Sequence, residues 1–106
     1  MYEDLTPQDW LARRENGEVW QLLDVREAWE TQIARVPMSI HIPMNEVPLR
    51  LDELDSSRPV AVLCHGGRRS AAVASVLVQA GFVNVVNIEG GIDAWSQEVD
   101  NTIPRY

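Results

Sequence analysis

The chain has 106 residues, 45% of them hydrophobic and 24% charged, with a formal net charge of −7 at pH 7. These values predict a single domain, residues 1–106, and no apolar run approaches the roughly 20 residues that a membrane span needs. Because Met1–Asp4 lacks a secretory signal pattern and phosphate contacts need a basic surface, we expect a cytoplasmic protein without membrane or nucleic-acid partners.

The first part of the chain predicts a helix followed by a strand. Thr6 can serve as the N-cap with Pro7 at the first helical position, and Asn16-Gly17 ends this helix. Residues 19–23 then have the apolar and aromatic side chains of a strand. This strand delivers Asp24 at its carboxyl end, where an acidic side chain is a candidate site residue.

The middle of the chain predicts shorter elements. Residues 27–32 indicate a short helix, and 39–42 indicate a brief extended segment. Asn45 can cap a further helix over 46–54. These elements connect the first predicted strand to the second half of the chain.

The second half of the chain alternates strands and helices. Residues 60–63 are a short apolar run typical of a buried strand, 70–80 are a helix that a glycine ends, and 83–88 are a β-branched strand. Glu89-Gly90-Gly91 turns the chain into a last helix. This rhythm predicts an α/β fold with a mostly parallel central sheet and helices on both faces, in which ligands bind beyond the carboxyl ends of the strands.

One loop concentrates the residues that can carry chemistry. The sequence Cys64-His65-Gly66-Gly67-Arg68-Arg69-Ser70 joins the buried strand to the next helix and holds the only cysteine. The glycines allow several backbone N–H groups to point at one centre, and the arginines and a helix N-terminus favour negative charge there. This environment favours a thiolate nucleophile and an anionic substrate. A single cysteine and the absence of lysine exclude an internal disulfide, a cysteine-rich zinc site and lysine chemistry.

Simpler interpretations of the same residues stay open. A lone cysteine after an apolar run is often only a small buried side chain. Ser70 is expected to help organise the site, by capping the helix rather than by reacting. Asp24 and Arg26 are also expected to organise the site, as a helix cap and as an ion pair of Arg26 with Glu27 or Glu30.

Three segments, taken in chain order, carry a family resemblance. They are Asp24-Val25-Arg26-Glu27, Cys64-x-x-Gly67-x-Arg69-Ser70 and Glu89-Gly90-Gly91-Ile92-Asp93-Ala94-Trp95. In order and spacing they resemble the Asp-x-Arg element, the active-site loop and the Glu-Gly-Gly-x-x-x-Trp segment of the rhodanese family, the thiosulfate sulfurtransferases. The resemblance covers about residues 5–96, leaves 97–106 as a tail, and implies a single rhodanese-like domain.

This resemblance implies sulfur transfer in two steps. Cys64 would attack the outer sulfur of thiosulfate, release sulfite and hold a persulfide, which an external thiol, dithiol or redox protein would then take up. The residues implied to bind the donor are His65, Gly66, Gly67, Arg68 and Arg69. Backbone amides would stabilise the persulfide and Arg69 would hold the sulfonate oxygens, while His65 can alternatively be an ordinary loop residue. No cofactor and no metal are implied.

One segment departs from the family pattern. Many members carry Gly-His-Ile-Pro-Gly-Ala where this chain has Ala34-Arg35-Val36-Pro37-Met38-Ser39, so that only Pro37 is kept. Met38 stands where the family has a glycine, and this calls the local backbone turn into question. Because the cysteine loop is untouched, we expect any effect to be on substrate or partner preference.

Three other functions fit parts of the pattern. A phosphatase or arsenate reductase of the same fold has its phosphate-binding arginine six positions after the cysteine, where this chain has Ser70. A non-catalytic rhodanese-like interaction module typically loses the cysteine or distorts its loop, whereas Cys64 and Arg69 are kept here. 3-Mercaptopyruvate is an alternative sulfur donor, but the paired arginines favour a doubly charged donor such as thiosulfate.

Overall fold

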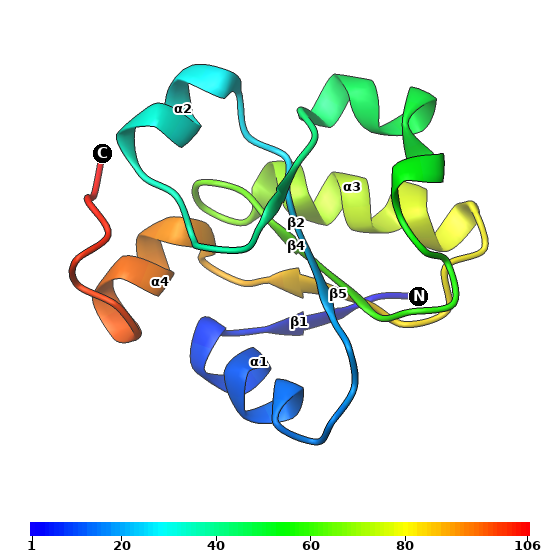
Figure 1. Cartoon of the computed structure of the whole chain (residues 1–106), viewed down its shortest axis with the longest axis horizontal. Helices are drawn as coiled ribbons and strands as arrows, with labels where there is room; N and C mark the ends of the chain where they lie inside the picture. Colours follow the sequence, from blue (N-terminus) through cyan, green and yellow to red (C-terminus); the bar gives the residue numbers. More distant parts are fainter.

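Parallel strands form the centre of the molecule (Figure 1). The computed structural model describes the whole chain, residues 1–106. The strands are β1 (Glu3–Leu5), β2 (Gln21–Asp24), β3 (Ile40–His41), β4 (Val60–Leu63) and β5 (Val85–Ile88). They form one five-stranded sheet in the order β1-β5-β4-β2-β3, in which every pairing is parallel. The predicted α/β fold with a parallel central sheet is confirmed.

Helices cover both faces of this sheet. They are α1 (Pro7–Arg14), α2 (Ala28–Ile33), α3 (Arg68–Gln79) and α4 (Gly91–Glu98), with two 3-10 segments, η1 (Met44–Leu49) and η2 (Leu51–Glu53). Helices α1 and α4 lie side by side on one face, and α3 packs with η1 on the other (Figure 1). Helix α2 follows directly from the carboxyl end of β2.

The alternating side chains of β4 explain why both faces are covered. Val60 and Val62 pack toward α3, whereas Ala61 and Leu63 pack toward α1 and α4. A strand that is apolar on both sides needs cover on both sides. Cys64 continues the series of Val60 and Val62, so its side chain lies in the core on the α3 side of the sheet.

The start of the chain folds largely as its local signals predict. Thr6 is the N-cap of α1, and its Oγ1 accepts the Asp9 N–H at 3.2 Å, with Pro7 as the first helical residue. The hydroxyl thereby satisfies one of the N–H groups that a helix start leaves without an internal partner. The strand predicted over 19–23 begins later, at Gln21, and includes Asp24.

Two features of the secondary structure differ from the prediction. The helix predicted over 46–54 is wrong, because this stretch forms the 3-10 segments η1 and η2, and η1 is capped by Pro43 rather than by Asn45. Pro48 lies inside η1, where its missing N–H cannot contribute the bond that an α-helix requires. The sequence also did not predict β1, a short edge strand whose two acidic residues disfavour strands.

The segment that departs from the family pattern contains a strained residue. Met38 has a φ of 69°, the only positive φ among the non-glycine residues of the chain. A left-handed backbone costs a residue with a Cβ atom about 1–2 kcal/mol. The Met38 side chain is exposed, so its packing does not offset this cost. The turn that a glycine adopts easily is therefore kept here with a methionine.

Replacing Met38 by glycine should raise the free energy of unfolding by about 0.5–1 kcal/mol, because the relief of strain exceeds the greater freedom of glycine in the unfolded chain. Urea denaturation of Met38→Gly measures this change. Leu49→Gly is the matched control, since Leu49 is equally exposed but has no positive φ, and this control should lose stability. If Met38→Gly is less stable than the natural chain, the backbone of Met38 is not strained.

Candidate active site

Two expected site residues meet at the carboxyl edge of the sheet. These are Asp24 and Cys64. Asp24 ends β2 and Leu63 ends β4, and Asp24 is the register partner of Leu63 in the neighbouring strand. Cys64 follows Leu63 directly, so the loop that it opens begins beside Asp24. This edge is where parallel sheets bind ligands, because the strand ends and the following loops converge there.

The Cys64 thiol lies at the bottom of this loop, with only 1% of the residue exposed. Its Sγ accepts the Gly67 N–H at 3.1 Å and lies 3.2 Å from the Ser70 hydroxyl oxygen. Gly67 has a φ of 104°, a conformation that lets the chain curl back over the sulfur before α3 begins. Gly67 is also the N-cap of α3, so the expected capping role of Ser70 is wrong.

Ser70 is held from the sheet by a chain of polar groups. Its hydroxyl donates to Oδ1 of Asn87 at 2.5 Å, and the Asn87 amide donates to Asp4 at 2.9 Å and to the Gly67 carbonyl at 3.3 Å. The hydroxyl has a single proton, so it can accept from the thiol while it donates to Asn87, or turn to donate to a thiolate. Asn87 was not predicted as a site residue, because an asparagine within a β-branched strand carries no signal of this contact.

The start of α4 orients the backbone of the loop. The Ile92 N–H donates to the Cys64 carbonyl at 2.8 Å, and the Asp93 N–H donates to the His65 carbonyl at 3.1 Å. Because a trans peptide sets its N–H opposite its carbonyl, the N–H groups that follow these carbonyls point away from α4. Only glycine fits at position 91, since a Cβ atom on Gly91 would lie 2.5 Å from the Cys64 carbonyl oxygen.

The loop keeps unpaired backbone donors around the sulfur. The N–H groups of His65, Gly66, Arg68 and Arg69 have no hydrogen-bond acceptor in the chain. They adjoin the N-terminus of α3, a helix of 12 residues whose dipole adds positive potential. Converging N–H donors at such a position can hold a negative charge on sulfur or on a bound anion.

The two loop arginines differ in their partners. Arg68 is exposed and takes part in no ion pair. The Arg69 guanidinium is bidentate on Glu30, with Nη1 2.6 Å from Oε2 and Nη2 2.8 Å from Oε1. Glu30 of α2 is thus the partner of Arg69. The expected ion pair of Arg26 with Glu27 or Glu30 is wrong, because Arg26 pairs with Asp24. Arg68 is the one guanidinium of the loop that no carboxylate of the chain engages.

Glu30 is a buried carboxylate with both oxygens occupied. Only 3% of its side chain is exposed, and it also accepts the N–H of Glu27 and the hydroxyl of Tyr106, each at 2.8 Å. Hydrogen bonding to Arg69 lowers the pKa of Glu30 to about 2, against the opposing effect of burial. The Glu30–Arg69 salt bridge is thus fully formed at neutral pH.

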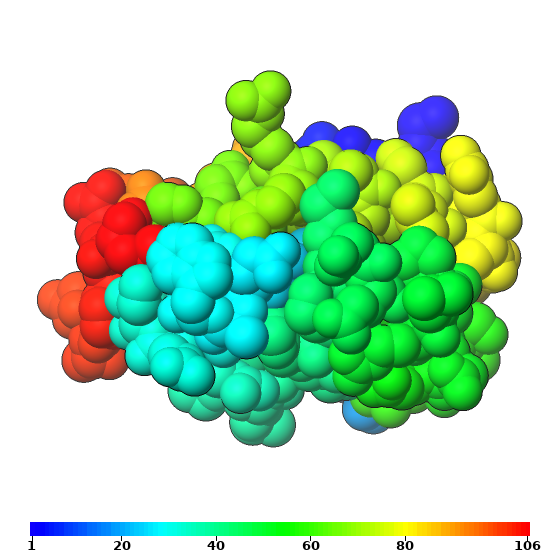
Figure 2. All heavy atoms as spheres, turned by 90° about the horizontal axis from the view of Figure 1, so that it is seen from above, coloured from blue at the N-terminus to red at the C-terminus, as the bar shows by residue number.

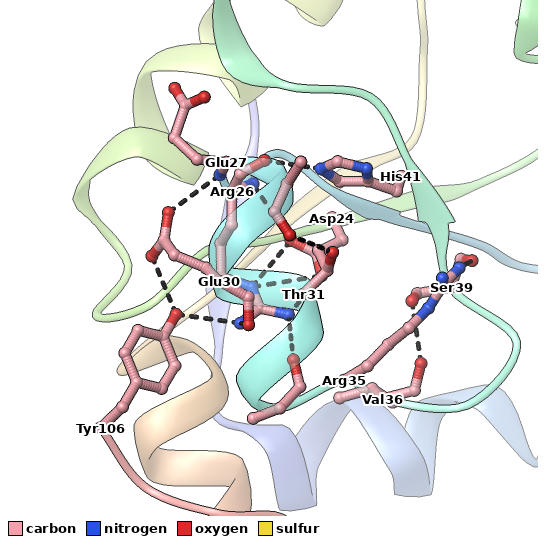
Figure 3. A network of polar contacts seen from close by, with 12 residues as sticks. Asp24, Arg26, Glu27, Glu30, Thr31, Arg35, Val36, Ser39, His41 and Tyr106 are labelled. Carbon is pink, nitrogen blue, oxygen red and sulfur yellow. Dashed lines mark hydrogen bonds and ion pairs between the residues drawn. The ribbon is translucent and has the colours of Figure 1, made fainter.

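A second ion pair, between Asp24 and Arg26, lies next to Glu30 and is fully buried (Figure 3). Arg26 donates to Asp24 through Nε at 3.0 Å and through Nη2 at 2.7 Å, and neither side chain is exposed. The remaining guanidinium donors reach the carbonyls of Glu30 and Ala34 and the hydroxyl of Tyr106. Removing one partner of such a buried pair typically costs about 3–5 kcal/mol, because the other charge is left uncompensated.

The fold brings all the expected site residues to the loop or directly beneath it, and it adds three that the sequence did not assign to the site. These are Glu30, Asn87 and Tyr106. No group of three or more His, Cys, Asp or Glu side chains is arranged to hold a metal ion. None of the helices combines the length and the apolar character needed to cross a bilayer.

Comparisons with known proteins agree on one family. The model of the rhodanese-like domain family matches residues 7–98. The chain is 35% identical to the putative sulfur carrier protein YrkF of Bacillus subtilis, over 81% of this chain and 46% of that protein, so it spans about half the length of this relative. It is 32% identical to thiosulfate sulfurtransferase GlpE of Pseudomonas savastanoi, over 89% of this chain and 87% of that one. A rhodanese-like domain protein of Staphylococcus aureus superposes with a TM-score of 0.82 at 29% identity, over 98% of both chains.

The stability conferred by Glu30 should depend on pH below about 5. Its pKa is about 2 in the folded protein, against about 4.3 in an unfolded chain. The carboxylate therefore stabilises the fold fully above the unfolded value, and this contribution is lost as the pH falls toward 2. The difference in unfolding free energy between the natural chain and Glu30→Gln, measured with urea, should be largest at pH 6 and shrink as the pH is lowered to 2.5.

Glu98→Gln is the control for this titration, because Glu98 is exposed and forms no ion pair. Its difference from the natural chain should be small at every pH. If the Glu30→Gln difference does not shrink as the pH falls, the stabilisation does not come from the ionised carboxylate.

Proposed function

Because the chain belongs to the rhodanese-like domain family, we propose that it is a sulfurtransferase that carries sulfane sulfur on Cys64. The observation that supports this proposal most directly is the buried thiol, whose sulfur accepts one backbone N–H in a loop where the neighbouring backbone N–H groups are unpaired. Such a site stabilises negative charge on sulfur. A thiolate that is stabilised in this way needs no general base to remove its proton.

The first step is the attack of the Cys64 thiolate on the outer sulfur of a donor such as thiosulfate. A bond forms between Sγ and this sulfur, the sulfur–sulfur bond of the donor breaks, and sulfite leaves with the electron pair. The product is a cysteine persulfide whose terminal sulfur carries the negative charge. The unpaired N–H groups of the loop are the donors available to stabilise it, while the Gly67 N–H stays on Sγ. These unpaired groups belong to His65, Gly66, Arg68 and Arg69.

The second step transfers the outer sulfur to an acceptor. A thiolate or cyanide attacks the terminal sulfur, the persulfide bond breaks, and Cys64 leaves as a thiolate that is ready for another cycle. The chain has one cysteine, so the acceptor is a separate molecule, such as a thiol, a dithiol or a redox protein. This ping-pong course requires the donor product to leave before the acceptor reacts.

Thiosulfate is the donor that the charges favour. Arg68 lies at the start of α3 without a carboxylate partner, so it can bind the sulfonate oxygens without breaking an existing ion pair. Arg69 is already bound to Glu30 and acts mainly by fixing the shape of the loop. A doubly charged donor gains more from this positive potential than the singly charged 3-mercaptopyruvate. The name of the Pseudomonas savastanoi relative, thiosulfate sulfurtransferase GlpE, agrees with this assignment.

Incubation with thiosulfate should add one sulfur atom to the protein, because the persulfide is a covalent intermediate. Mass spectrometry of the intact chain detects this gain, and cyanide should remove it and restore the original mass. Cys64→Ser should gain nothing, while its circular dichroism spectrum stays that of the natural fold.

Two outcomes would contradict the proposed sulfur transfer and favour another function. A folded natural chain that gains no sulfur would favour a non-catalytic interaction module. Hydrolysis of a small aryl phosphate that is abolished by Cys64→Ser would favour a phosphatase.

Replacement of Arg68 and replacement of Arg69 should have different effects on the kinetics and on stability. Arg68→Ala removes a charge-assisted contact with the donor, so the KM for thiosulfate should rise about tenfold with little change in unfolding free energy. Arg69→Ala leaves the buried Glu30 carboxylate without its partner, so both stability and kcat should fall. Arg13→Ala is the control, since Arg13 pairs with Glu3 on an exposed surface. An Arg68→Ala variant with an unchanged KM would remove Arg68 from donor binding.

A further inference from the structure

The segment after α4 folds back over the body of the protein. The Ser96 hydroxyl donates to the Ile103 carbonyl at 2.5 Å, the Ile103 side chain is buried, and Arg105 pairs with Asp93 at 2.9 Å. These contacts bring Tyr106 to the region of α2 and the cysteine loop. Figure 2 shows this segment, in red, directly beside the cyan residues of α2.

The ring of Tyr106 packs against the residue that follows the cysteine. It stacks on the His65 imidazole, with the two ring centroids 4.2 Å apart and the planes inclined by 14°. The Trp29 ring also approaches Tyr106, edge to face, with the two ring centroids 6.2 Å apart. Tyr106 therefore lies between α2 and the loop and covers one side of His65.

The hydroxyl of Tyr106 joins the two ion pairs of the site (Figure 3). It accepts from Nη1 of Arg26 at 2.9 Å and donates to Oε1 of Glu30 at 2.8 Å. Burial raises the pKa of Tyr106 to about 12, so the phenol keeps its proton and remains a donor at neutral pH. The same Glu30 oxygen accepts from Nη2 of Arg69.

We propose that Tyr106 is a positioning residue for the cysteine loop, which it holds through its ring on His65 and through its hydroxyl on Glu30. This inference rests on the proposed sulfur transfer and adds a residue outside the matched family region, residues 7–98. Tyr106 touches neither the thiol nor the unpaired N–H groups, so it acts through other residues. Its consequence is a loop whose donors converge on one anion without having to be ordered when the anion binds.

The hydroxyl and the ring of Tyr106 make separate contributions to the loop. Without the hydroxyl, Oε1 of Glu30 keeps only Arg69, and the side-chain link between the Glu30–Arg69 and Asp24–Arg26 pairs is lost. Only the contact of Arg26 with the Glu30 backbone carbonyl then joins them. Without the ring, His65 loses the surface on which its side chain lies, and its backbone N–H is one of the unpaired donors. Tyr106→Phe removes the first contact and keeps the second, whereas Tyr106→Ala removes both.

The test uses two readouts, one that depends on sulfur transfer and one that does not. The first readout is kcat/KM for thiosulfate. The second is the ratio of the rates at which Cys64 is alkylated by iodoacetate, an anion, and by iodoacetamide, its neutral counterpart. This ratio reports how strongly the loop attracts an anion, and it does not change when a variant is merely less stable but still folded. Asn101→Ala, in the same segment and exposed, is the matched control.

Tyr106→Ala should lower kcat/KM about tenfold and the alkylation ratio at least about threefold, because misplaced donors stabilise an anion less. Tyr106→Phe should lie between this variant and the natural chain, and Asn101→Ala should stay within about twofold of the natural chain. Proton NMR of His65 adds a direct check, since ring-current shifts of its imidazole protons should persist in Tyr106→Phe and vanish in Tyr106→Ala.

The inference is overturned if Tyr106→Ala keeps the natural alkylation ratio, even when its kcat/KM or its melting temperature falls, because the residue then serves only stability. If the natural chain takes no sulfur from thiosulfate, the proposed function fails, and the alkylation ratio still decides the role of Tyr106.

Discussion

The buried Arg26 guanidinium is the interaction on which the rest of the site depends. It sits at the end of β2 with none of its side chain exposed, and its donors reach Asp24, the carbonyls of Glu30 and Ala34, and Tyr106. Two of these acceptors are backbone carbonyls one turn apart, Glu30 within α2 and Ala34 at its C-cap, so one charged group fastens a helix of 6 residues that is too short to be stable by itself. Fixing α2 in turn aims the Glu30 carboxylate at the cysteine loop. A buried charge is thus used to set geometry, and its cost is offset by complete hydrogen bonding.

The charges of the site also explain how an acidic protein can attract an anion. The formal net charge of the chain is −7, and within the site Asp24 balances Arg26 while Glu30 balances Arg69. What remains is the positive charge of Arg68, the dipole of α3 and the unpaired backbone N–H groups. The attraction of an anionic donor that we propose is therefore local, and it acts at the cysteine loop. A general surface charge could not give this selectivity.

Local signals predicted most of the fold but only part of the site. The apolar run at 60–63, the Thr6 N-cap and the glycine-rich loop act over a few residues, so their structure can be anticipated from neighbours in the chain. The partner of Arg69 could not be anticipated, because Glu30 meets the loop only after α2 docks on the sheet end. The stacking of Tyr106 on His65 is likewise a product of tertiary packing alone. Residue types were enough to place a glycine-rich cysteine loop at the end of a buried strand, whereas the pairing of its charges required the fold.

The contact between α4 and the loop sets the order in which this part of the protein can fold. The carbonyls of Cys64 and His65 are oriented by N–H groups of Ile92 and Asp93, which are synthesised later. Protein chains emerge from the ribosome with the N-terminal part first. Until α4 has emerged and docked, these two hydrogen bonds do not hold the peptide planes of the loop. The backbone geometry of the cysteine loop is therefore completed by a helix that is synthesised after the loop itself.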